Sequence, residues 1–187
     1  MDVENKILTL GDANLLKEDL QKFETVFLAS LEAANVYSLA AMGNLSIDAL
    51  ISGAVTGYSN RVSSHLPAIT REDINEAGRC LAFERATACG FHILRGVESV
   101  MEHYIIKAQG TIPAIKTWHE YIVAIDGCGG SDKIRNLLRS MKDHYRNPLM
   151  HPEDTLDIGQ AIGLFSLSQT AIEAMITELI ARNLIQP

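Results

Sequence analysis

The sequence lacks the features that mark several large classes of protein. It has no basic excess, because 16 lysines and arginines stand against 23 aspartates and glutamates, and the net charge is −7. A strong basic excess is the usual footprint of nucleic-acid-binding domains, so any contact with a nucleic acid must come from a local basic patch. The three cysteines show no paired short spacing, which argues against a disulfide framework and a zinc site. We expect reduced, mostly buried thiols.

The sequence also lacks membrane and cofactor signatures. No uncharged apolar run approaches the length of a membrane span, and the polar, acidic start Met1–Lys6 does not resemble a signal peptide. No glycine-rich phosphate loop, nucleophile elbow or paired metal-ligand spacing occurs. We therefore expect a cytoplasmic protein with no membrane partner, no metal and no cofactor. The 187 residues, 47% of them hydrophobic and 21% charged, suit one globular domain.

Hydrophobic residues recur at spacings of three and four along most of the chain, which predicts helices. The first helix should begin near Asp12 or Asn14, either of which can cap it. A segment capped by Thr70 should run with little interruption into the next long helix. The last helix is apolar on more than one face, which indicates a central helix or one shared with a second subunit. The expected helices cover about 12–31, a segment from 70 onward, and then 84–107, 115–125, 131–145 and 156–182.

The stretch from about 35 to 70 breaks this pattern. Gly43-Asn44 is a turn signal and Pro67 marks another break. We interpret the stretch as an irregular insertion with short helices or a small hairpin. The predicted fold class is therefore all-α, with one domain over 1–187. We expect an antiparallel helical bundle with an irregular insertion after the first helix.

The stretch Arg146-Asn147-Pro148-Leu149-Met150-His151 concentrates side chains suited to phosphate chemistry. A proline disfavours helical conformation in the residue before it, so a helix should end at Asn147. The end of an element on a rigid scaffold is a common place for catalytic groups. The break in the backbone after Arg146 could also bring this side chain and His151 together.

Metal-free cleavage of RNA needs a base for the ribose 2′-hydroxyl, an acid for the leaving 5′-oxygen and a cation for the phosphorane. His151 can serve as base or acid because histidine titrates near neutral pH. The guanidinium fork of Arg146 matches two phosphate oxygens, and Asn147 could orient substrate or hold the histidine tautomer. The alternative is structural: Arg146 complements a helix dipole and His151 caps a turn. We interpret His144 as structural, or at most as a supporting residue.

Charged residues of the expected long helix form a second candidate group. Arg85 and His92 are seven residues apart and share a helix face, and Arg95 and Glu98 lie at salt-bridge spacing. One interpretation is an intrahelical charge network along a solvated edge. The other is a supporting layer of residues, or a further basic contact, that faces the Arg146 motif across the bundle.

An all-α bundle with Arg-Asn-x-x-x-His resembles the HEPN superfamily (higher eukaryotes and prokaryotes nucleotide-binding). The motif of that superfamily is an arginine, then four to six residues, then a histidine, often with a polar residue directly after the arginine. Ala77–Glu84, Gly90–Arg95 and the segment 146–153 also resemble a group of uncharacterised bacterial HEPN-like proteins. The resemblance covers roughly Asp73 to Leu179.

The resemblance implies a four-helix core and a metal-independent endoribonuclease, of the kind found in toxin–antitoxin, abortive-infection and CRISPR systems. It implies a homodimer with a composite site, an RNA substrate, a 2′,3′-cyclic phosphate product, and an antitoxin or other regulatory protein as partner. Arg146 would carry the arginine role, His151 the acid/base role and Asn147 the accessory role. Some superfamily members keep the fold without catalysis. The alternative is therefore a non-catalytic dimeric module that binds a nucleotide or a partner protein. The net acidity is unusual for an enzyme that cleaves RNA.

Overall fold

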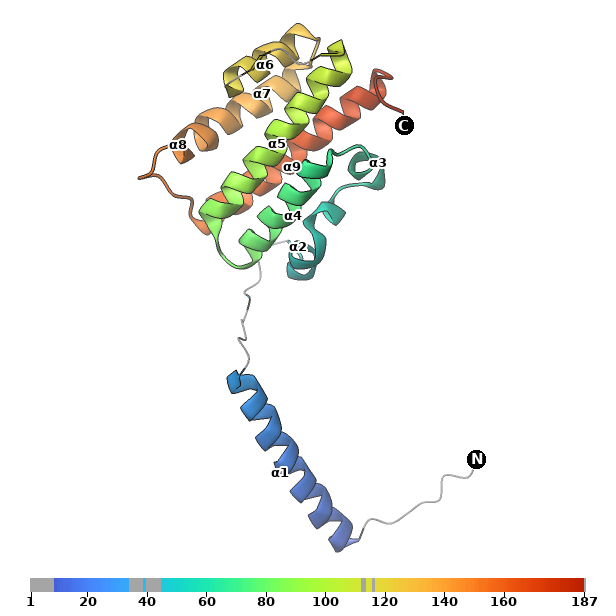
Figure 1. The fold of residues 1–187 in the computed structure, drawn as a ribbon, viewed down its shortest axis with the longest axis vertical. Helices are drawn as coiled ribbons and strands as arrows, with labels where there is room; N and C mark the ends of the chain where they lie inside the picture. Colours follow the sequence, from blue (N-terminus) through green and yellow to red (C-terminus); the bar gives the residue numbers. More distant parts are fainter. Residues whose placement is uncertain (1–8, 34–38, 40–44, 112–113, 116, 187) are drawn as a thin grey trace. The chain divides into compact units, whose positions relative to one another are not determined.

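The computed structural model describes residues 9–33, 39, 45–111, 114–115 and 117–186. The chain forms two compact units, residues 1–38 and 39–187. The predicted all-α class is confirmed, because the described residues form helices and turns with no strand among them (Figure 1). None of these helices is long and apolar enough to cross a membrane. The single domain predicted over 1–187 stays a prediction.

The first unit contains α1 (Leu10–Ala33), which begins earlier than predicted. Thr9, and not Asp12 or Asn14, caps it: the Thr9 hydroxyl accepts from the Asp12 backbone N–H at 3.2 Å. The Asp12 carboxylate in turn accepts from the Thr9 backbone N–H at 2.9 Å, so the two residues satisfy each other's free donors. The predicted apolar stripe lies on exposed side chains: Leu16, Leu20, Phe23, Phe27 and Leu31.

Short helices fill the described part of the predicted insertion, whose residues 35–38 and 40–44 lie outside the described residues. These helices are α2 (Ile47–Gly53), η1 (Ala54–Gly57) and α3 (Asn60–Ser63). Ser46 and Ser59 cap α2 and α3 with their hydroxyls. Tyr58 and Val62 are buried and tie this region to the core.

The next two helices are α4 (Ala68–Ala82) and α5 (Ala86–Gln109). α4 begins directly after Pro67, so Thr70 is not its cap. Thr70 is instead buried inside α4, where its hydroxyl donates to the Gly96 carbonyl of α5 at 3.5 Å. Pro67 can start a helix because its fixed φ suits that position and its missing N–H is not needed there.

A sharp interruption separates α4 from α5, so the expected near-continuous helix is wrong. Glu84 has φ 57°, in the left-handed region that side chains with a Cβ rarely adopt. The Arg85 N–H then donates to the Cys80 carbonyl at 2.7 Å and closes the turn. α5 runs to Gly110, which has φ 81° and ends the helix as a left-handed cap.

The rest of the second unit comprises α6 (Trp118–Gly127), α7 (Asp132–Met141), η2 (Lys142–Arg146), α8 (Asn147–Leu149) and α9 (Ile158–Ala181). α5 packs on both α4 and α9, while α6 packs on α5 and α7, and α7 packs on α9 (Figure 1). Because α9 contacts α4, α5 and α7, its apolar residues on more than one face are explained within this unit. The core side chains without solvent exposure include Leu81, Ile93, Met101, Ile105, Leu164 and Ile172.

Candidate functional site

The helix that carries the predicted motif does not end at Asn147. α7 passes into η2, which is a π-helical turn, and then into α8. Asn147 has φ −64° and ψ −50°, which are helical values even though Pro148 follows. In a regular α-helix the proline ring would clash with a carbonyl one turn earlier, and the wider π turn relieves this clash. The break therefore comes after Leu149.

The three predicted catalytic side chains differ in exposure. Arg146 is half-buried, whereas Asn147 and His151 are exposed. His151 follows α8 in a turn, where its N–H donates to the Pro148 carbonyl at 2.8 Å and its carbonyl accepts from the Asp154 N–H at 3.1 Å. The backbone of His151 is thus held while its imidazole faces solvent.

Arg146 lies on the wall of a pocket of about 340 Å³ that it shares with α5. His92, Arg95 and Glu98, three of the charged residues picked out from the sequence, lie on the same wall. Their supporting role stays a prediction. The complete lining is Phe91, His92, Leu94, Arg95, Glu98, Trp118, Arg146 and Met150. The predicted site residues that do not line it are Arg85, His144, Asn147 and His151.

A buried carboxylate of α4 holds two of these side chains in place. Asp73 has no solvent exposure, and it accepts hydrogen bonds from Arg95 Nε at 2.7 Å and Nη2 at 2.5 Å. The Asp73 Oδ1 atom also lies 3.1 Å from His92 Nδ1. The hydrogen bonds and negative charge of Asp73 raise the pKa of the Arg95 guanidinium. Sequence reasoning missed Asp73, since an acidic residue near a helix start is usually explained by the helix dipole.

Glu98 does not make the expected ion pair with Arg95. Its carboxylate accepts from the Trp118 indole N–H at 2.5 Å, which links α5 to the start of α6. Arg95 turns instead to Asp73, so the contacts cross between helices and do not run along α5. The intrahelical network expected from the spacing is therefore replaced by interhelical contacts that line the pocket.

The segment that carries His151 is packed against the first turns of α5. The Leu156 N–H donates to the Thr87 hydroxyl at 3.1 Å. A Cβ on Gly90 would lie 2.7 Å from Leu156 Cδ1 and 2.9 Å from Leu149 Cδ1, so these leucines fill the space left by the glycine. Both ends of the segment around His151 are therefore anchored to α5.

Two of the predicted supporting residues lie apart from this pocket. Arg85 is exposed at the start of α5, near Cys80, whose pKa is raised first by burial and is partly lowered by the Arg85 charge. His144 is exposed within η2. Neither lines the pocket that holds Arg146, and their supporting role stays a prediction.

The charged groups on the pocket wall are the guanidinium groups of Arg146 and Arg95 and the carboxylate of Glu98. Arg95 is partly neutralised by Asp73, and Glu98 is engaged by Trp118. Among the described residues, no ion pair involves Arg146. A half-buried guanidinium without a carboxylate partner presents its donors to ligands, and its geometry suits phosphate.

Comparisons with models of protein families, with curated proteins and with solved structures give no match to this chain.

Proposed function

We propose that this protein is a metal-independent endoribonuclease and that the pocket at Arg146 receives the scissile phosphate. One observation carries the proposal: Arg146, which forms no ion pair with any residue that the structure describes, shares a pocket with Arg95 and His92. These three basic groups lie together on a chain of net charge −7, and the carboxylate on the same wall, Glu98, accepts a hydrogen bond from Trp118. A cation on the phosphate stabilises the charge that develops in the transition state.

The proposed reaction requires two proton transfers. The ribose 2′-oxygen attacks phosphorus as a base removes its proton, and the bond from phosphorus to the 5′-oxygen breaks as an acid protonates that oxygen. The products are a 2′,3′-cyclic phosphate and a free 5′-hydroxyl. His151 would act as the base or the acid, and Asn147, exposed beside Arg146, would orient the substrate.

A composite site in a homodimer accounts for the separation of the two main groups. His151 is exposed and does not line the pocket of its own chain. In the proposed dimer, His151 of one copy works beside Arg146 of the other, and α4, α5, α7 and α9 form the HEPN-like four-helix core. An antitoxin or other regulatory protein would restrain such an activity by covering the pocket.

The test is cleavage of a mixed-sequence RNA in excess EDTA by the wild type, Arg146→Ala and His151→Ala. Matched controls are Arg139→Ala and His119→Ala, which remove exposed side chains of the same types elsewhere in the second unit. We expect cyclic-phosphate ends from the wild type and both controls. The two site variants should be slower by about 10²–10⁴-fold.

Mixing the two inactive variants tests the composite site. A mixed dimer holds one site with an intact Arg146 and an intact His151, so cleavage should return to a measurable fraction of the wild-type rate. Failure of the mixture, with both variants folded and dimeric, would refute a site shared between copies. Cleavage that survives in both single variants would refute the assignment of the residues.

The second candidate function is a non-catalytic dimeric module that binds a nucleotide or a partner protein. The observation that favours it is the position of His151, outside the pocket that holds Arg146. This function predicts that no RNA is cleaved. It also predicts that a labelled mononucleotide binds to the wild type and to His151→Ala, and that Arg146→Ala loses this binding.

A further inference from the structure

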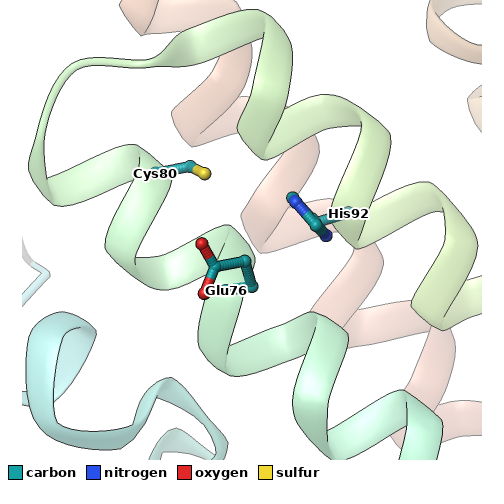
Figure 2. A group of neighbouring side chains, drawn as sticks. All are labelled: Glu76, Cys80 and His92. Atoms are coloured by element: carbon teal, nitrogen blue, oxygen red, sulfur yellow. The ribbon is translucent and has the colours of Figure 1, made fainter.

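Three side chains with metal-binding atoms converge between α4 and α5, and one of them, His92, also lines the pocket that holds Arg146. They are Glu76 and Cys80, one helical turn apart on α4, and His92 of α5 (Figure 2). One carboxylate oxygen, the thiol sulfur and one ring nitrogen all lie within 4.8 Å of one another. Sequence reasoning expected no metal site, because no paired spacing shows that His92 packs beside the α4 pair.

The His92 ring is held in the orientation that a metal ligand needs. Its Nδ1 atom lies 3.1 Å from Asp73 Oδ1, and Asp73 is itself buried and clamped by Arg95. With Nδ1 donating to this carboxylate, the lone pair lies on Nε2. Figure 2 shows one ring nitrogen directed toward Cys80. A carboxylate behind a histidine is the usual support of metal-bound imidazole, because it fixes the tautomer and the ring plane.

We propose that Glu76, Cys80 and His92 bind one zinc-like divalent transition-metal ion. Thiolate, imidazole and carboxylate are the three ligand types of protein zinc sites, and hard ions such as Mg²⁺ and Ca²⁺ avoid sulfur. Three protein ligands leave a fourth position for water. The proposal does not depend on ribonuclease activity, because metal binding itself is the readout.

The side chains need only small movements to close around an ion. Bonds of about 2.0–2.3 Å place tetrahedral ligand atoms roughly 3.3–3.6 Å apart, so a spread of up to 4.8 Å closes by about 1 Å. Glu76 uses Oε2 for a 3.0 Å hydrogen bond from Arg79, which leaves Oε1 for the metal. That ion pair is exposed on both sides and contributes little stability, so it offers weak competition.

An entry route from solvent is present. A surface pocket of about 320 Å³ reaches Glu76 and His92, and its lining is Glu72, Asp73, Asn75, Glu76, Arg79, His92 and Arg95. Cys80 is buried behind this opening. Solvent access from one side and a sulfur ligand at the back would let an ion enter and lose most of its water.

The test is titration of the tag-free protein with Co²⁺, followed by displacement with Zn²⁺. We expect a thiolate-to-cobalt absorption band that saturates at one ion per chain and disappears when Zn²⁺ is added. Cys80→Ser should abolish the band, and His92→Gln and Glu76→Gln should weaken Zn²⁺ binding at least about 10-fold. Asp73→Asn, which loosens the ring support, should weaken it about 10–100-fold. The controls Cys128→Ser, another free thiol, and Glu72→Gln, in the same pocket, should bind as the wild type does.

A measurement on the wild type alone guards against variants that fail to fold. Zn²⁺ should slow iodoacetamide modification of Cys80 and leave that of Cys128 unchanged, as read by mass spectrometry. The proposal is overturned by a wild type without the cobalt band, by a band that persists in Cys80→Ser, or by Cys80 modification that Zn²⁺ does not slow.

Discussion

Asp73 and Arg95 form an ion pair across 22 residues of sequence, with the carboxylate fully buried and the guanidinium largely exposed. Asp73→Asn keeps the size of the side chain and removes its charge. We expect the free energy of unfolding to fall by about 1–3 kcal/mol, because the hydrogen bonds lost involve a charged group. In this variant the Arg95 guanidinium can turn to solvent, so no unpaired buried charge lowers the free energy of unfolding further. Urea denaturation followed by circular dichroism measures the change.

The control for this variant is Glu76→Gln, which removes an exposed partner of Arg79 on the same helix. Exposed pairs contribute at most about 1 kcal/mol, so this variant should be nearly neutral. Equal losses in the two variants would contradict the special position of Asp73.

At Gly78, α4 lies in close contact with α2 and η1. A Cβ there would lie 2.5 Å from the Ala54 Cβ and 2.9 Å from the Leu50 carbonyl oxygen, which belongs to the backbone and cannot rotate away. Gly78→Ala should therefore destabilise the protein by about 1–3 kcal/mol through overpacking. Gly127→Ala is the matched control, because a Cβ at Gly127 meets no atom within 4 Å. Thermal unfolding should place the control at or above the wild type, and a neutral Gly78→Ala would contradict this packing.

Two buried tyrosine hydroxyls have opposite surroundings. Tyr104 donates to Glu178 at 2.5 Å and accepts from Arg182 at 2.7 Å, whereas the Tyr58 hydroxyl has no hydrogen-bond partner in the described structure. Tyr104→Phe should lower the free energy of unfolding by about 1–2 kcal/mol, because it removes hydrogen bonds to charged groups. Tyr58→Phe should be neutral or stabilising, because it removes an unsatisfied polar group. Chemical denaturation of both variants checks the order, and the reverse order would count against these hydrogen-bond assignments.

The half-buried His103 should make stability depend on pH. Burial lowers its pKa, with further lowering by the charges of Lys107 and His65, which face it. Near pH 6.5 the His103 imidazole therefore binds a proton in the unfolded chain but remains neutral in the folded chain. The contribution of neutral His103 to the free energy of unfolding is complete above pH 6.5. It is lost as the pH falls toward the lower pKa of His103 in the folded chain.

The measurement is urea unfolding of the wild type and His103→Gln at pH 7.5 and at pH 5.5. The wild type should lose more stability on acidification than the variant, by less than about 1 kcal/mol because solvent screens a half-exposed ring. His119→Gln, which alters an exposed histidine, should follow the wild type. An equal loss in all three proteins would show that His103 does not titrate differently on folding.

Helix positions followed from periodicity where the apolar residues face a single core. The helices that became α5, α7 and α9 were predictable for this reason. The turn at Glu84 was not, because nothing in its side chain favours the left-handed conformation that separates α4 from α5. The cap at Thr9 was missed because local hydrogen bonds, and not the apolar pattern, determine where α1 begins.

The candidate site also contains residues that the sequence predicted and contacts that it did not. Arg146 and His151 attracted attention through residue type and spacing, and their proposed roles stay predictions. The sequence did not predict that His92 and Arg95 share the partner Asp73, because this contact depends on the packing of α4 on α5. The cluster of Glu76, Cys80 and His92 depends on the same contact. Contacts between helices bring both groups of side chains together, and a single sequence does not reveal these contacts.

The π-helical turn η2 also determines which residues face the core after it. Such a turn holds one residue more than an α-helical turn, and each residue advances the helix by about 100°. Downstream side chains are therefore rotated by that angle relative to an unbroken helix. In this register Leu149 is buried against α5 at Gly90, while Met150 and His151 remain exposed. A chain one residue shorter here would turn a different side chain inward, so the position of His151 depends on the length of this turn as much as on the proline.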